Sequence, residues 1–198
     1  MLLAAAAAHA NPLVDKLVDQ LEASPAGCGT VSPGHPQRRL IEADIARVTG
    51  TVALPPGVRF EVMDCPVDGF VNKGRTIVIS ARLARMTAPQ RFFIIAHEMG
   101  HLKLQHHAAI LSFVARAVNS SADESAARAL IASGLAAISH QAELDADAFA
   151  VRTMREAGLD PEDAARIFDS IGEGSDNGTH PSPGRRARAI RAIALTAN

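Results

Sequence analysis

Two histidines and a glutamate in the pattern His-Glu-x-x-His are the residues of this sequence best suited to chemistry. His97, Glu98 and His101 lie in the apolar segment 89–107, which is predicted to be helical. Their spacing places both imidazoles on one helix face, one turn apart, where they can bind a single Zn²⁺ ion. Glu98 would lie beside the metal and take a proton from zinc-bound water, whose pKa the ion lowers to about 7.

A structural role is the alternative for these histidines. The chain has eight His in 198 residues, and the pattern arises by chance in roughly one or two such chains per hundred. A single His on an apolar face is more often a hydrogen-bonded core residue. A pair with an intervening Glu inside an apolar helix favours the metal site, because unpaired buried polar groups cost several kcal/mol.

A zinc ion held by two histidines and a water needs a third protein ligand. Glu143 and Asp147 share one face of a helix predicted over 135–157. One of them can bind the metal while the other accepts the outer N–H of a ligating imidazole and sets its tautomer. A solvated acidic face is the alternative. His140 is a rival ligand, ranked lower because it is nearer the helix start.

The segment Thr179-His180-Pro181 precedes a helix predicted from Pro183, so His180 has a defined position; a surface turn is the alternative. The chain has seven Phe but no Tyr and no Trp. A second electrophile, needed to stabilise an oxyanion, must therefore be an imidazole, a guanidinium or a backbone group. His180 is the leading candidate.

Composition narrows the class of protein and its partners. The chain has 198 residues, 47% hydrophobic residues and a net charge of −1, which predicts one domain with a sizeable core. Balanced charge and scarce aromatic residues argue against nucleic-acid binding. No apolar run approaches the roughly 18 residues of a transmembrane helix. The expected partner is a polypeptide, and the oligomeric state is left open.

Hydrophobic periodicity predicts an α+β fold with a small β-sheet in the first half and a predominantly helical C-terminal half. β-Branched runs predict strands at 58–62 and 76–80, separated by a turn-rich segment 64–75. Helices are predicted at 12–21, 37–49, 89–107, 108–118, 121–133, 135–157, 161–171 and 183–196.

The N-terminus and the two cysteines bear on the compartment. Residues 1–10 are either the end of a signal peptide, for which Ala8-His9-Ala10 is a suitable cleavage site, or an Ala-rich helix. A periplasmic or secreted protein is favoured over a cytoplasmic one. Cys28 and Cys65 are expected to be free thiols, with one disulfide as the alternative in an exported protein.

Four segments together resemble the gluzincin metallopeptidases of the HtpX and CAAX-prenyl-endopeptidase type, metallopeptidase family 48. They occur in the family's order and cover roughly residues 58–193. They are the turn and strand at 68–79, H-E-M-G-H at 97–101 followed by His106, E-L-D-A-D at 143–147, and T-H-P at 179–181 with Arg186 downstream.

The resemblance implies a zincin-like fold with a small mixed β-sheet and an active-site helix. It implies one zinc ion per chain, with His97, His101 and Glu143 as its ligands. It also implies that strand 76–80 is a sheet edge to which an extended substrate adds; core packing is the alternative for this strand.

The family's catalytic roles carry over residue by residue. Glu98 is implied to be the general base. Asp147 is implied to be the hydrogen-bond partner of a zinc-binding histidine, expected to be His97. His180 is implied to stabilise the oxyanion, with Arg186 steadying it.

The resemblance leaves several residues without a functional role. His106 and His107 are expected to be structural. Residues 51–198 are expected to be the zinc metallopeptidase catalytic domain, and 11–50 a helical segment whose role is open.

Many relatives have membrane spans near or between these motifs. The residues between the motifs are charged in this sequence, which predicts a soluble version.

The predicted function is that of a zinc metalloendopeptidase acting on protein substrates. One alternative is a non-catalytic or autoinhibited zinc-binding module, chaperone-like, whose cleft is plugged by segment 24–36 or 172–179. Another is a regulator-cleaving zinc protease of the toxin–antitoxin or phage-repressor type, which would share His-Glu-x-x-His but not need Thr179-His180-Pro181.

Overall fold

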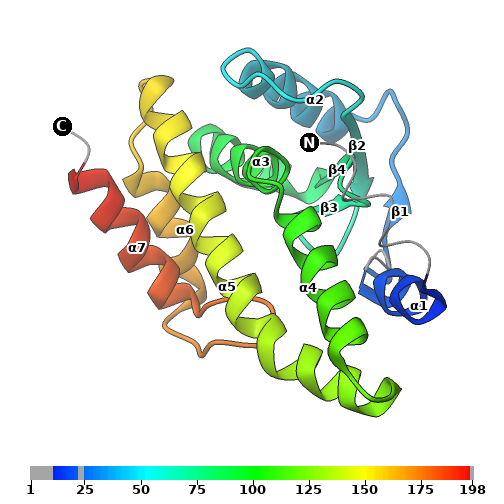
Figure 1. Ribbon diagram of the computed structural model, residues 1–198. Coiled ribbons are helices and arrows are strands. Elements are labelled where there is room, and N and C mark those ends of the chain that lie inside the picture. Colours follow the sequence, from blue (N-terminus) through cyan, green and yellow to red (C-terminus); the bar gives the residue numbers. More distant parts are fainter. Residues whose placement is uncertain (1–10, 22–24, 197–198) are drawn as a thin grey trace.

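The computed structural model describes residues 11–21 and 25–196 (Figure 1). The interpretation of residues 1–10 as the end of a signal peptide lies outside these ranges. The helices are α1 (Pro12–Leu21), α2 (Pro36–Thr49), α3 (Ala88–Lys103), α4 (His106–Ser120), α5 (Glu124–Glu156), α6 (Glu162–Ile171) and α7 (Pro183–Thr196). The strands are β1 (Gly29–Thr30), β2 (Arg59–Asp64), β3 (Gly69–Asn72) and β4 (Thr76–Ser80), and a 3₁₀ turn, η2 (Ala81–Arg85), follows β4.

The four strands form one mixed sheet in the order β1-β2-β4-β3. β2 and β4 are parallel, whereas β1 pairs with β2 and β3 with β4 in antiparallel fashion. With the helical C-terminal half, this confirms the α+β prediction. Strand β3 lies in segment 64–75, which was expected to be rich in turns and for which no strand was predicted. Lys73 and Gly74, with φ of 49° and 60°, make the tight turn between β3 and β4. This turn folds β3 back onto β4, with which it pairs in antiparallel fashion.

Strand β4 is central, and the expectation that segment 76–80 is a sheet edge is wrong. β2 flanks it on one side and β3 on the other, and all five of its residues are buried. Its continuous run Thr-Ile-Val-Ile-Ser is typical of a strand covered on both faces. Within the described residues, the edge strand next to β4 is β3.

Helix α5 is continuous over 33 residues, whereas the sequence predicted two helices that meet near Gly134. A Cβ on Gly134 would lie 2.6 Å from the Phe113 ring, so this glycine makes room for α4 rather than ending the helix. None of the helices in the described ranges combines the length and the apolar character that a membrane span requires.

The apolar side chains form two clusters. In the main one, α3 lies between the sheet on one side and α5, α6 and α7 on the other (Figure 1). α2 joins this core through Ile41, Ile45 and Val48. The smaller cluster fills the space between α1, α4 and the first half of α5, with Val14 and Leu17 of α1 buried. Residues of the N-terminal segment therefore contribute to both cores.

A disulfide joins Cys28, just before β1, to Cys65, just after β2. The expectation of two free thiols is therefore wrong. The pairing of Gly29 with Asp64 in the β1–β2 ladder brings the two cysteines together. Since this pairing involves segments far apart in the sequence, local sequence pattern did not reveal it.

Candidate active site

Helix α3 carries the His-Glu-x-x-His residues in the middle of the protein. It begins with a capping box between Thr87 and Gln90, and its apolar residues bury it between the sheet and α5. His97 and Glu98 are consequently only 5% and 7% exposed. The Nε2 atoms of His97 and His101 face each other at 3.0 Å.

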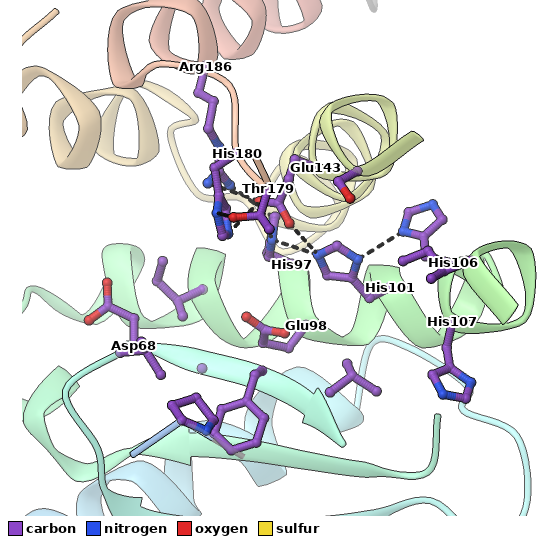
Figure 2. A pocket seen from close by; sticks show the side chains of 18 of the residues that line it. Asp68, His97, Glu98, His101, His106, His107, Glu143, Thr179, His180 and Arg186 are labelled. Carbon is purple, nitrogen blue, oxygen red and sulfur yellow. Dashed lines mark hydrogen bonds and ion pairs between the residues drawn. The ribbon is translucent and has the colours of Figure 1, made fainter. Parts of the chain in front are cut away.

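Gly100 allows α5 to approach this helix closely. A Cβ at this position would lie 3.2 Å from the Ala146 Cα atom and 3.2 Å from the Phe149 ring. The close packing brings Glu143 of α5 over the two histidines (Figure 2). Glu143 Oε1 lies 3.2 Å from His101 Nε2, and Oε2 lies 3.5 Å from His97 Nε2.

Asp147 orients His97 from one turn further along α5. Its Oδ1 lies 2.9 Å from His97 Nδ1, and it is fully buried. Burial alone would raise the pKa of Asp147, but the Arg186 guanidinium and the hydrogen bond to His97 hold it below its usual range. An ionised Asp147 accepts the proton of Nδ1–H, so in the neutral form of His97, the form that binds metal, we assign the lone pair to Nε2.

His106 holds His101 in the corresponding way. The two Nδ1 atoms are 2.9 Å apart. Desolvation by burial lowers the pKa of His106 to about 4, so this ring is neutral and we assign its Nδ1 as the acceptor of His101 Nδ1–H. His106 was expected to have only a structural role. Its contact depends on Gln105, whose φ of 58° turns the chain between α3 and α4.

The resulting group fits a metal ion. One ligand atom each from His97, His101 and Glu143 lies within 4.8 Å of the others. Burial alone would raise the pKa of Glu143, but hydrogen bonds to both histidines hold it well below its usual range. Its buried Oε2 atom accepts no well-formed hydrogen bond, although Arg186 Nη1 lies 3.1 Å away. Two imidazole nitrogens and one carboxylate are a common donor set for Zn²⁺.

Glu98 lies beside this group, on the side of α3 that faces the sheet (Figure 2). Edge strand β3 passes close to it, since a Cβ on Gly69 would lie 2.9 Å from Glu98 Cγ. Desolvation by burial raises the pKa of Glu98. Gly69 and Glu98 line a cleft of about 660 Å³ whose walls also include residues of α4, α5 and α6. Pro25 and Thr179 reach the cleft from the two segments considered as plugs.

His180 lies over the candidate metal-binding group formed by His97, His101 and Glu143, from the loop before α7 (Figure 2). Its Nε2 is 3.8 Å from Glu143 Oε2, and its Nδ1 is 2.8 Å from Thr179 Oγ1. Desolvation by partial burial lowers the pKa of His180. Arg186, expected to steady His180, instead makes its hydrogen bonds and ion pairs with Asp147 and Glu143.

The rival ligand His140 lies outside the metal-binding group. Its Nε2 is 2.6 Å from the backbone oxygen of Asn177. His107, expected to be structural, lines the cleft, and a Cβ on Gly74 would lie 2.7 Å from its Nδ1.

A comparison of the sequence with protein-family models covers all of these candidate site residues together. A family model described as peptidase family M48 matches residues 61–194, which is more than half of the chain and spans every residue of the cluster. No curated protein matches the chain.

Proposed function

Since the chain belongs to peptidase family M48, we propose that it is a zinc-dependent metalloendopeptidase that hydrolyses peptide bonds of polypeptide substrates. The observation that carries this proposal is the convergence of His97, His101 and Glu143, with the buried carboxylate of Glu98 beside them. The paired partners of both imidazoles, Asp147 and His106, support it because they leave both Nε2 atoms free to bind metal.

Each residue has a defined task in this proposal. Bound zinc would supply a Lewis acid that polarises the scissile carbonyl and acidifies the attacking water. Glu98 accepts the proton of that water and delivers it to the leaving amine; its raised pKa suits both steps. The Thr179 hydroxyl lies 3.2 Å from Asn177 Oδ1 and 2.8 Å from His180 Nδ1. We assign its proton to the shorter contact, so that His180 Nε2–H points at the developing oxyanion.

We propose that β3 is the strand along which the substrate lies. It pairs only with β4 among the described residues, and Gly69, Phe70 and Val71 line the cleft beside Glu98. An extended polypeptide can therefore add its backbone hydrogen bonds to this edge. The role of substrate-binding edge strand, first implied for segment 76–80, is therefore proposed for β3 instead.

We also propose that the protein works in an oxidising compartment, such as a periplasm or the extracellular space. The Cys28–Cys65 disulfide supports this location, because such bonds persist outside reducing cytosol. Residues 51–198 remain the proposed catalytic domain, and α2 of the preceding segment supports its core.

The central experiment compares wild type with Glu98→Gln for zinc content and for cleavage of an unfolded protein such as casein. Both proteins should bind one zinc ion, and only wild type should cleave. Glu156→Gln, which changes an exposed glutamate at the end of α5, is the matched control. Stoichiometric zinc without cleavage by wild type would favour the non-catalytic binding module, and absence of zinc would refute the site.

The ligand set has its own test. Glu143→Ala should lose zinc, because the two remaining imidazoles bind it weakly. His140→Ala should retain zinc, since its ring contacts Asn177 instead. The reverse result would make His140 the third ligand.

A further inference from the structure

The loop that carries Thr179 and His180 is held mainly by hydrogen bonds. It spans residues 172–182 between α6 and α7; residues 172–180 are all exposed, whereas Pro181 and Ser182 are buried. Such a segment has few apolar contacts to keep it in one conformation. Its polar contacts, together with the buried Pro181 next to it, therefore decide where His180 lies.

Asn177 closes a tight turn around His180. Its Oδ1 accepts hydrogen bonds from the backbone N–H groups of Thr179 at 2.8 Å and His180 at 2.7 Å. Its own backbone N–H donates to the His180 carbonyl at 3.0 Å. Asp176 attaches the turn to the start of α7, since it accepts hydrogen bonds from Ser182 N at 2.7 Å and Arg185 Nη1 at 2.9 Å. Residues 176–182 are thus linked to one another by hydrogen bonds.

One side chain joins this unit to the helix that carries Glu143. His140 lies one turn before Glu143 on α5, and its side chain is 14% exposed. Its Nε2 is 2.6 Å from the Asn177 carbonyl oxygen, and its Nδ1 is 3.6 Å from Asp176 Oδ2. A second polar contact between the loop and α5 is longer, with His180 Nε2 at 3.8 Å from Glu143 Oε2.

We propose that His140 is a positioning residue, which donates Nε2–H to the Asn177 carbonyl and thereby sets His180 against Glu143. The inference rests on the proposed function in one respect, that His180 stabilises the oxyanion. One face of helix α5 then positions both parts of the site: Glu143 binds the metal, and His140 fixes the position of His180, the electrophile. Loss of the hydrogen bond would let the turn drift while the metal-binding group stays in place.

The test uses zinc-loaded His140→Leu, which has similar bulk but no donor. We expect kcat to fall about three- to tenfold, the loss that one hydrogen bond accounts for, with KM and zinc content unchanged. Hydrogen exchange of the 176–182 peptide should become faster. His140→Gln, whose amide can still donate to the carbonyl, should recover most of kcat. Gln141→Leu, an exposed neighbour on α5, is the matched control.

A second background separates positioning from general destabilisation. In His180→Ala, the further change His140→Leu should leave kcat unaltered, because the residue through which it acts is gone. If His140→Leu folds poorly, His140→Asn replaces it, since this polar side chain is too short to reach Asn177.

Three outcomes would overturn the proposal. They are loss of zinc in His140→Leu, an equal fall in kcat in the His180→Ala background, and unchanged hydrogen exchange of the 176–182 peptide. If wild type cleaves no substrate, the proposed function fails, whereas hydrogen exchange still tests the link between His140 and the loop. Slower turnover in His180→Ala supports the oxyanion role independently of His140.

Discussion

Asp147 and Arg186 form a two-point ion pair that joins α5 to α7 behind the metal-binding group. Arg186 Nε lies 2.8 Å from Asp147 Oδ2, and Nη2 lies 2.6 Å from Oδ1. The same Oδ1 accepts the hydrogen bond from His97 Nδ1. Helix α7 is therefore linked to His97 on α3 through a single buried carboxylate.

Removing the guanidinium should weaken metal binding. Arg186→Met leaves Asp147 as an uncompensated buried charge, which destabilises proteins by about 3–5 kcal/mol, and loosens the orientation of His97. We expect zinc affinity to fall about 10- to 100-fold, measured by competition with a chelator. Arg188→Met, whose arginine pairs with exposed Glu173, is the control and should bind zinc normally. Unchanged affinity in Arg186→Met would refute control through Asp147.

A side chain at Gly100 should push α5 away from α3. Gly100→Ala places a methyl group 3.2 Å from the Ala146 Cα atom, so backbone must move. We expect a loss of about 1–3 kcal/mol in the free energy of unfolding together with weaker zinc binding, because Glu143 moves with α5. Urea denaturation and chelator competition measure the two effects. Gly34→Ala has open space around its new methyl group and should change neither; a stable Gly100→Ala with normal zinc affinity would contradict the packing argument.

Reduction of the Cys28–Cys65 disulfide should destabilise the fold. The bond closes a loop with a sequence separation of 37, for which the chain-entropy model gives about 4 kcal/mol. The free energy of urea unfolding, measured with and without reductant, should differ by roughly this amount. The double variant Cys28→Ser, Cys65→Ser should be insensitive to the reductant. A reductant effect in that variant would show that the bond is not its cause.

Acid should weaken the contact between α6 and α7. Arg191 hydrogen-bonds to Glu162 and Asp169 and thereby lowers the pKa of both carboxyl groups from 4.5 and 3.8. Groups with a depressed folded-state pKa stabilise the protein above their unfolded pKa values, and the stabilisation is lost as the pH falls through the folded ones. The stability difference between wild type and Arg191→Met should therefore be full at pH 6 and smaller at pH 3, measured in chelator by urea denaturation.

Measurements at high salt are the control for the comparison of wild type with Arg191→Met, because salt screens ion pairs. The ion pairs are exposed, so 0.5 M NaCl should reduce the difference at pH 6. A difference that persists unchanged at pH 3 would mean that Arg191 stabilises the helices by packing rather than by charge.

Local pattern was sufficient for the α+β class, for strand β4 and for the helix that carries His97, Glu98 and His101. In each case the decisive signal lies within one segment, as apolar periodicity or as a spacing of one helical turn. The same periodicity placed Glu143 and Asp147 on one face of a helix. It could not say which of them meets the histidines, and the resemblance to a family supplied that assignment.

Contacts across the fold decided the rest, because they join residues that no local pattern relates. Glu143 lies near the Nε2 atoms of both histidines because Gly100 lets α5 pack closely against α3. Asp147, one turn further along α5, contacts His97 Nδ1 instead. His106 meets His101 because of the turn at Gln105. His140 contacts the loop before α7 rather than the candidate metal ligands. By itself the sequence determined which faces are buried and where chemistry is concentrated; only the tertiary structure decided what lies opposite each face.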